Sequence, residues 1–266
     1  MAVVTSPIMN VMMKAAEKAA RSLIRDFGEV EQLQVSQKGP GDFVTAADKR
    51  AEEIIHEELK HAQPTYSFLM EESGAIEGSN SDFRWIVDPL DGTTNFLHGI
   101  PHWCISIALE SKGDITHGLI YDPVKDEMFT GEKGQGAFIH RNKRLRVSGR
   151  RDMMHATIAT GAPRRAQKSQ EQFLNEYRAV LNLAPGIRRF GAAALDLAYV
   201  AAGRYEAFWE RDLKAWDIAA GILIVKESGG FIAELDSHKA SPLDTGNILA
   251  SNEGLFNDMK KVLKAA

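Results

Sequence analysis

The sequence contains very little cysteine and no long apolar run, and both absences limit what the protein can be. Cys104 is the only cysteine among 266 residues, so an intramolecular disulfide is impossible and a reducing compartment is indicated. No apolar stretch approaches the roughly 20 residues that a membrane-spanning helix needs. Residues 1–13 include Pro7 and Asn10 but no early basic cluster, which makes a poor signal peptide. We therefore expect a cytoplasmic protein that does not cross a membrane.

The sequence also lacks an excess of positive charge. Its formal net charge of −4 gives no global attraction to nucleic acid. One local basic stretch, residues 141–151, is typical of a solvated hairpin, and a role in binding a partner is the less favoured interpretation.

The length and composition favour a globular protein built from helices and strands. A chain of 266 residues suits one large domain or two closely packed halves. We predict a single domain over residues 1–266, with subdomains of about 1–150 (α+β) and about 151–266 (α/β). Apolar residues at helical spacing predict helices over 11–27, which Gly28 would end, and over 45–61.

Strand-like runs dominate from residue 66 to about 147, and they predict an antiparallel-rich sheet. After residue 150 strands and helices alternate, which is typical of a layered α/β architecture. The elements expected there are strand 156–160, helix 168–183, strand 187–190, helix 192–202, strand 205–209, helix 215–227, strands 231–235 and 248–251, and helix 253–264.

The most informative run is Trp85-Ile-Val-Asp-Pro-Leu-Asp-Gly-Thr-Thr-Asn-Phe96. Its apolar start predicts a buried strand that stops at Asp88-Pro89, with Asp88 and Asp91 on either side of the Leu90 carbonyl. These oxygen ligands suit a hard cation such as Mg²⁺. The turn that follows would enter a helix, whose N-terminal amides could bind phosphate. An ordinary strand-to-turn exit is the alternative for Asp-Pro-Leu-Asp-Gly alone. The full run suggests metal-assisted phosphoryl chemistry.

The twelve-residue run closely resembles the signature of the inositol monophosphatase family, the lithium-sensitive, Mg²⁺-dependent phosphatases. Glu71-Glu72-Ser73, after the apolar run 66–70, resembles a second family segment, and Trp216-Asp217 with the small residues after it resembles a third. Taken alone, the Glu pair would be an acidic loop flank and Asp217 a helix N-cap. All three segments together, in the family's order, indicate a bacterial inositol-1-monophosphatase type.

The resemblance implies a five-layered αβαβα sandwich, a homodimer and two or three Mg²⁺ ions. It assigns metal binding to Glu71, Asp88, the Leu90 carbonyl, Asp91 and Asp217. It assigns catalysis to Glu71 and Thr93, which would position the attacking water, and to Asp48, which would hydrogen-bond the Thr93 hydroxyl. Lys38 and Asp42 would lie near the rim of the site. Substrate contacts fall on Asp91, Gly92, Thr93, Thr94, Gly191, Ala193, Glu210 and Asp217.

The implied reaction is hydrolysis of a phosphomonoester by in-line attack of a metal-activated water, without a covalent intermediate. A cysteine-based phosphatase is excluded because no Arg occurs at positions 105–110, downstream of Cys104. Residues 103–109 predict a core strand that buries this cysteine.

The substrate is less well defined than the reaction. Members of the superfamily hydrolyse inositol phosphates, fructose 1,6-bisphosphate, histidinol phosphate, nucleotide 3′-phosphates or NADP. The Trp-Asp-x-Ala-Ala-Gly form, the chain length and Glu210 favour inositol monophosphate. Within 157–163, where relatives place a polar substrate contact, Thr160 is the single candidate, and Arg164-Arg165 would favour a more anionic substrate.

Two other functions stay open at this point. Bacterial relatives also act as RNA-polymerase accessory factors in antitermination, and the basic stretch 141–151 could make such transcription-machinery contacts. A binding protein without catalysis is disfavoured, because every expected ligand position holds a competent residue.

Overall fold

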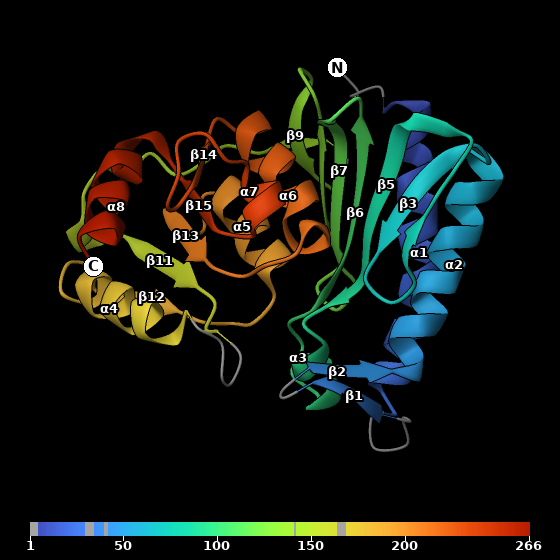
Figure 1. Cartoon of the computed structure of the whole chain (residues 1–266), viewed down its shortest axis with the longest axis horizontal. Coiled ribbons are helices and arrows are strands. Elements are labelled where there is room, and N and C mark those ends of the chain that lie inside the picture. The colour runs from blue at the N-terminus through green and yellow to red at the C-terminus, as the bar shows by residue number, and fades with distance from the viewer. Residues whose placement is uncertain (1–4, 30–34, 40–41, 141, 164–168) are drawn as a thin grey trace.

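The computed structural model describes residues 5–29, 35–39, 42–140, 142–163 and 169–266, with only the backbone for those between 35 and 45. Its elements form five layers in the order αβαβα (Figure 1). Helices α1 (Pro7–Phe27) and α2 (Ala46–Ala62) cover one face of a large sheet. Helices α5 (Ala193–Ala201) and α6 (Ala215–Glu227) lie between this sheet and a second one. Helices α4 (Gln170–Leu181) and α8 (Glu253–Ala265) cover the far side. The predicted five-layered sandwich is confirmed.

The larger sheet has eight strands in the order β10-β9-β8-β7-β6-β5-β3-β4. All neighbouring pairs are antiparallel except β3 and β5, which are parallel. The antiparallel-rich character of residues 66–147 is therefore confirmed. The strands are β3 (Tyr66–Met70), β4 (Gly74–Ile76), β5 (Asn80–Asp91), β6 (Cys104–Ser111), β7 (Asp114–Asp122), β8 (Glu127–Glu132), β9 (Gly136–Ile139) and β10 (Lys143–Arg144).

The smaller sheet has five strands in the order β12-β11-β13-β15-β14. It is mixed, because β11 lies parallel to both β12 and β13, whereas β15 is antiparallel to its two neighbours. The alternation predicted after residue 150 is confirmed, with boundaries that shift by at most about two residues, an ordinary disagreement for element ends. The strands are β11 (Thr157–Thr160), β12 (Gly186–Arg188), β13 (Ala207–Glu210), β14 (Phe231–Glu234) and β15 (Ile248–Ser251).

Short elements complete the chain. A two-stranded ribbon pairs β1 (Val35–Gly39) with β2 (Asp42–Thr45), and α3 (Thr93–Leu97) follows β5 directly. Short helices η2 (Met153–His155) and α7 (Pro242–Thr245) lie in connecting segments. None of the described helices is long and apolar enough to span a membrane.

Helix α1 begins earlier than its apolar periodicity predicts. It starts at Pro7 rather than near residue 11, and the Ser6 hydroxyl accepts a hydrogen bond from the Met9 backbone N–H at 3.1 Å. Serine followed by proline is a strong helix-start signal. The periodicity beginning at residue 11 missed this first turn because a cap carries no apolar spacing. The predicted end at Gly28 is confirmed.

The predicted stop of the strand at Asp88-Pro89 is wrong, because β5 continues to Asp91. The register against β6 shifts between Asp88 and Asp91. Proline is tolerated at such an irregularity because its missing N–H is not needed by the ladder. The Leu90 N–H instead donates to Asp88 Oδ1 at 2.9 Å. The bulge therefore lets one strand deliver Asp88, the Leu90 carbonyl and Asp91 in sequence.

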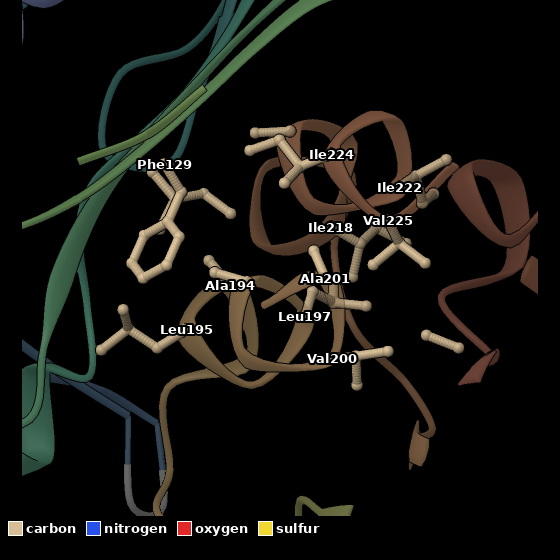
Figure 2. Close-up of a cluster of buried hydrophobic side chains, with 14 of the residues drawn as sticks. Phe129, Ala194, Leu195, Leu197, Val200, Ala201, Ile218, Ile222, Ile224 and Val225 are labelled. Atoms are coloured by element: carbon tan, nitrogen blue, oxygen red, sulfur yellow. The ribbon is translucent and has the colours of Figure 1, made fainter. Parts of the chain in front are cut away.

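The central helical layer fixes the start of α6 against both sheets. Figure 2 shows Phe129 of β8 facing side chains of α5 and α6, among them Leu195 and Ile224. Gly118 of β7 permits a close approach, since a Cβ there would lie 2.8 Å from the Ala220 carbonyl oxygen of α6. The buried side chains of this layer are closely packed, so α6 holds a fixed position.

Candidate active site

A cavity of about 820 Å³ opens where the end of β5 meets the starts of α3, α5 and α6 and the end of β13. It is lined by every predicted metal and substrate residue: Glu71, Asp88, Leu90, Asp91, Gly92, Thr93, Thr94, Gly191, Ala193, Glu210 and Asp217. Asp48 lies behind this lining and is fully buried. The structure thus brings together residues that are up to about 150 positions apart in the sequence.

Glu71 follows the last residue of β3 and is held by the neighbouring strand. Its backbone N–H donates to the Val87 carbonyl of β5 at 3.2 Å. The buried carboxylate of Glu52, from α2, accepts a hydrogen bond from the Glu72 N–H at 2.8 Å and another from the Ser73 hydroxyl. The Glu-Glu-Ser turn is therefore fixed from beneath, which leaves Glu71 as the member of the turn that lines the cavity.

Asp91 is held by groups from two other segments. Its Oδ2 accepts a hydrogen bond from the Ala194 backbone N–H at 2.7 Å and a weaker one from the Cys104 thiol at 3.8 Å. Ala194 lies in the first turn of α5, where unsatisfied N–H groups favour an anion. Cys104 is buried, as predicted for the core strand.

Asp217 lies in the first turn of α6 and completes the set of carboxylates. The simple N-cap interpretation of Asp217 is wrong, because the cap residue is Lys214. The Asp217 carboxylate accepts a hydrogen bond from the Lys214 backbone N–H at 2.6 Å, the acidic half of a capping box. The Trp216 carbonyl in turn accepts a hydrogen bond from the Ser106 hydroxyl of β6 at 3.2 Å. These bonds fix the start of α6 beside β5 and β6.

The carboxylates in the cavity repel one another. Burial raises the pKa of Asp88 well above its ordinary value, and the charges of Glu71, Asp91 and Asp217 raise that pKa further. Burial likewise raises the pKa of Asp91, followed by repulsion from Asp217, although the Ala194 N–H lowers it. A group of buried carboxylates with raised pKa values is destabilised in its ionised form, and a divalent cation would relieve that repulsion.

The donor set fits a hard divalent cation, although it does not form a finished coordination shell. In the part of the chain that the structure describes, no group of three or more His, Cys, Asp or Glu side chains is arranged as a ready-made metal site. The Asp88 side chain is instead hydrogen-bonded to Glu71. Carboxylates and a backbone carbonyl are the ligands that Mg²⁺ prefers, and it commonly keeps several waters.

The Thr93 hydroxyl lies at the start of α3 and contacts two acceptors. Its Oγ1 donates toward Asp48 Oδ1 at 3.2 Å and toward the Leu90 carbonyl at 3.1 Å. The first of these is the contact that the family resemblance implied. Gly92 makes this turn possible, because its φ of 96° is left-handed and a Cβ there would lie 3.1 Å from the His102 carbonyl oxygen.

Asn95 joins this turn to the second half of the chain. Its Nδ2 donates to the His102 carbonyl and to the Phe190 carbonyl, both at 2.7 Å. The next residue, Gly191, has a φ of 80° and leads into α5, which begins at Ala193. The two halves of the cavity are therefore tied by direct hydrogen bonds as well as by packing.

Sequence reasoning missed part of the cavity and misplaced one residue. Thr160 does not line it, because this side chain is fully buried and its hydroxyl donates to the Trp209 carbonyl at 2.8 Å. Gly161, Ala162 and Pro163 line the cavity in its place. The other lining residues that were not predicted as site residues are Asn95, Arg189, Arg211, Asp212, Leu213, Lys214, Trp216 and Thr245. The side chains of Lys38 and Asp42, and residues 164–165, lie outside what the structure describes.

Comparison with known proteins identifies the family. The model of the inositol monophosphatase family matches residues 5–265. The chain belongs to the inositol monophosphatase family.

Relatives agree with this membership over nearly their full lengths. The inositol-1-monophosphatase of Mesorhizobium japonicum is 54% identical and covers 97% of each chain. A solved structure of the extragenic suppressor protein suhB from Bartonella henselae has a TM-score of 0.94 at 54% identity, covering 97% of this chain and 99% of that one. The Nus factor SuhB of Pseudomonas aeruginosa is 44% identical over 94% of this chain and 93% of its own. The inositol monophosphatase fold of this chain is thus shared with both kinds of relative.

Proposed function

We propose that this protein is a Mg²⁺-dependent phosphatase that releases phosphate from inositol monophosphate. The observation that carries the proposal is the convergence of Glu71, Asp88, Asp91 and Asp217 with Thr93 in one cavity. The name of the 54% identical relative, an inositol-1-monophosphatase, supports the choice of substrate.

The proposed metal ligands follow from the donor set. Glu71, Asp88 and the Leu90 carbonyl would hold one Mg²⁺, and Asp88, Asp91 and Asp217 a second, with a weaker third ion near Glu71. Bound Mg²⁺ would lower the pKa of a water and neutralise charge that develops on the phosphate. A metal ion binds the ionised form of a carboxylate, so metal binding at Asp88 would compete with protonation.

The chain's own groups would orient the reactants. The Thr93 hydroxyl lies within hydrogen-bond distance of Asp48 and Leu90 and has one proton to donate. Its oxygen lone pairs could accept a hydrogen bond from the attacking water, which Glu71 would hold from its other side. The turn Gly92–Thr94 would contact the phosphate. Positioning a nucleophile in line with phosphorus accounts for much of the rate in phosphoryl transfer.

The second half of the chain would bind the alcohol. Gly191 and Ala193 line the cavity and would present backbone groups to the substrate, and Glu210 ends β13 at its wall. A carboxylate there can accept a hydrogen bond from a polyol hydroxyl, and Asp217 can accept another. This arrangement would orient the leaving oxygen toward the metal ligands.

The test is phosphate release from inositol 1-phosphate, fructose 1,6-bisphosphate, NADP, histidinol phosphate and adenosine 3′,5′-bisphosphate, each with Mg²⁺ and with EDTA. Asp91→Asn would abolish release, whereas Asp82→Asn, an exposed change on the same strand, would leave it unchanged. Preference for another substrate would keep the mechanism and overturn the substrate. No release from any substrate by a folded protein that binds Mg²⁺ would overturn the enzyme assignment.

We further propose that the enzyme acts as a cytoplasmic homodimer, formed by chains that each fold as one domain. Light scattering coupled to size-exclusion chromatography would give twice the chain mass of 29.4 kDa. A single-chain mass at working concentrations would contradict the dimer.

A second candidate function is contact with the transcription machinery. The Nus factor SuhB of Pseudomonas aeruginosa is a close relative. In this chain Arg144, Arg146, Arg151 and Lys226 line a separate cavity of about 560 Å³, beside the end of α6 opposite to Asp217. Retention of RNA polymerase by the purified protein, lost in an Arg144→Glu, Arg146→Glu variant that keeps phosphatase activity, would support this role. Equal retention by both proteins would contradict it.

A further inference from the structure

Gly161 lies so close to the Glu210 carboxylate that a side chain at position 161 would require this carboxylate to move. Both line the cavity. A Cβ built at position 161 would lie 1.7 Å from Glu210 Oε1 and 2.0 Å from Oε2. The Glu210 carboxylate therefore occupies the space that a side chain at position 161 would fill.

The backbone on either side of Glu210 cannot easily move to relieve such a clash. Trp209 Nε1 donates to the fully buried Glu176 carboxylate at 3.1 Å, and Arg211 Nε donates to the same carboxylate at 2.9 Å. The Thr160 hydroxyl also holds the Trp209 carbonyl at 2.8 Å. The residues before and after Glu210 are thus fixed to α4 and β11. A methyl group at position 161 would have to move the Glu210 side chain rather than the strand.

The Glu210 carboxylate affects which substrates its part of the wall favours, within a cavity that Arg189, Arg211 and Lys214 also line. A carboxylate accepts hydrogen bonds from hydroxyl groups, but it repels a phosphate in a dry or partly dry cavity. A substrate with one phosphate on the metal ligands and hydroxyls at Glu210 is therefore favoured. A substrate whose second phosphate reaches Glu210 is disfavoured.

We propose that Gly161 is a specificity-determining residue, because the space that it leaves for the Glu210 carboxylate makes the site select polyol monophosphates over substrates that carry a second phosphate. Gly161 acts through Glu210 and does not itself contact the reacting atoms. The inference rests on the proposed phosphatase function.

The first test is Gly161→Ala, assayed with Mg²⁺ on inositol 1-phosphate, fructose 1,6-bisphosphate and phenyl phosphate. Phenyl phosphate has neither a hydroxyl nor a second phosphate for Glu210. The displaced carboxylate would lower kcat/KM for inositol 1-phosphate by about 10-fold or more, mainly through KM, as expected for the loss of a specific polar contact. The rate on phenyl phosphate would change by less than about twofold. The ratio of monophosphate to bisphosphate activity would fall.

A double-variant comparison shows whether the effect passes through Glu210. Glu210→Ala removes the group that clashes, so Gly161→Ala would have no further effect on the inositol 1-phosphate rate in that background. Gly149→Ala is the control, because a Cβ at Gly149 meets no atom within 4 Å. This control would leave all three rates unchanged.

Three outcomes would overturn the inference. The first is a loss of activity on phenyl phosphate as large as the loss on inositol 1-phosphate. The second is an additive effect of Gly161→Ala in the Glu210→Ala background. The third is an unchanged ratio of the activity on inositol 1-phosphate to the activity on fructose 1,6-bisphosphate. If Gly161→Ala does not fold, Glu210→Gln is the test variant. An unchanged ratio of monophosphate to bisphosphate activity in Glu210→Gln would also overturn the inference. Failure of the phosphatase proposal is separate, since the wild-type protein would then hydrolyse none of the three substrates.

Discussion

The Ala194 backbone N–H lies 2.7 Å from Asp91 Oδ2 and donates a hydrogen bond to it across 103 positions of sequence. This contact joins the end of β5, in the larger sheet, to the start of α5, in the central helical layer. The contact orients one oxygen of Asp91, a proposed metal ligand. Burial raises the pKa of Asp91, repulsion from Asp217 raises it further, and the hydrogen bond from the Ala194 N–H lowers it. The stability of this junction should therefore depend on metal and on pH.

Asp91→Asn should have opposite effects on stability with and without metal. Asparagine keeps an acceptor for the Ala194 N–H but removes the repulsion from Asp217. In EDTA at neutral pH the variant should be more stable than the wild type by about 1 kcal/mol, because a carboxyl whose pKa is raised on folding costs stability above its ordinary pKa. Saturating Mg²⁺ should stabilise only the wild type. Urea denaturation under both conditions measures the two free energies of unfolding.

The pH dependence of this difference has a definite sign. The folded-state pKa of Asp91 is raised, so stability is lost as the pH rises from the ordinary pKa of an aspartate through this raised value. The destabilisation disappears as the pH falls and the carboxyl takes up a proton. The advantage of the Asp91→Asn variant in EDTA should shrink at low pH. A wild type that is more stable than the variant in EDTA at neutral pH would contradict this account.

The Thr93 hydroxyl should matter for the rate and little for stability. Thr93→Ser keeps the hydroxyl that contacts Asp48 and Leu90, whereas Thr93→Ala removes it. Loss of a group that positions a proton-transfer partner typically lowers kcat by about 100-fold or more. We expect that loss in Thr93→Ala, with near wild-type kcat in Thr93→Ser and similar melting temperatures for all three proteins. Equal kcat values for the two variants would show that the hydroxyl has no catalytic role.

The local parts of this site could be predicted from the sequence because each lies in one short segment. Local capping and turn residues are present in each of three segments: the turn after Val87, the Glu-Glu-Ser turn and the start of α6. The resemblance to the family indicated that these segments belong to one site. The continuation of β5 through Pro89 could not be predicted, because it depends on a register shift against β6. A strand's pairing partner is tertiary information that local propensity does not contain.

The misplacement of Thr160 has a similar cause. A threonine in a predicted strand can point to either face, and its hydroxyl here points to the Trp209 carbonyl of the adjacent strand. The cavity-lining position of Thr245 also could not be predicted, because α7 reaches the site through tertiary packing against α6 and β14. Both positions were set by contacts between distant segments.

Glu176 should be a major contributor to the stability of the second half of the chain. It is fully buried and accepts hydrogen bonds from Trp209 and from Arg211, whose side chain is only 8% exposed.

Glu176→Gln leaves the Arg211 guanidinium with Asp236 as its remaining charged partner in the described structure. Breaking one side of a buried ion pair costs about 3 kcal/mol or more. Urea denaturation should show this loss, whereas Glu171→Gln, an exposed change on the same helix, should cost less than about 0.5 kcal/mol. Equal effects of the two changes would contradict the assigned role.

His102 should make the protein less stable as the pH falls. The ring is buried next to Phe190, with 5.0 Å between the centroids, and its Nε2 has no hydrogen-bond partner in the described structure. Burial, followed by the charge of Lys125, lowers the pKa of His102 from 6.5 to about 4. Between these values the unfolded chain binds a proton that the folded protein does not bind. Stability is therefore lost as the pH falls from 6.5 to about 4, by at most about 1.4 kcal/mol per pH unit from this residue.

The measurement is the free energy of unfolding in EDTA across this pH range for the wild type and for His102→Phe. Phenylalanine keeps an aromatic ring against Phe190 and cannot take up a proton, so the variant's stability should fall less steeply with decreasing pH. Other groups, including His56 and His117, whose pKa values burial also lowers, contribute equally to both proteins and cancel in the difference. His61→Phe, at an exposed position, should follow the wild-type curve. Parallel curves for the wild type and His102→Phe would show that His102 is protonated equally in the folded and unfolded states.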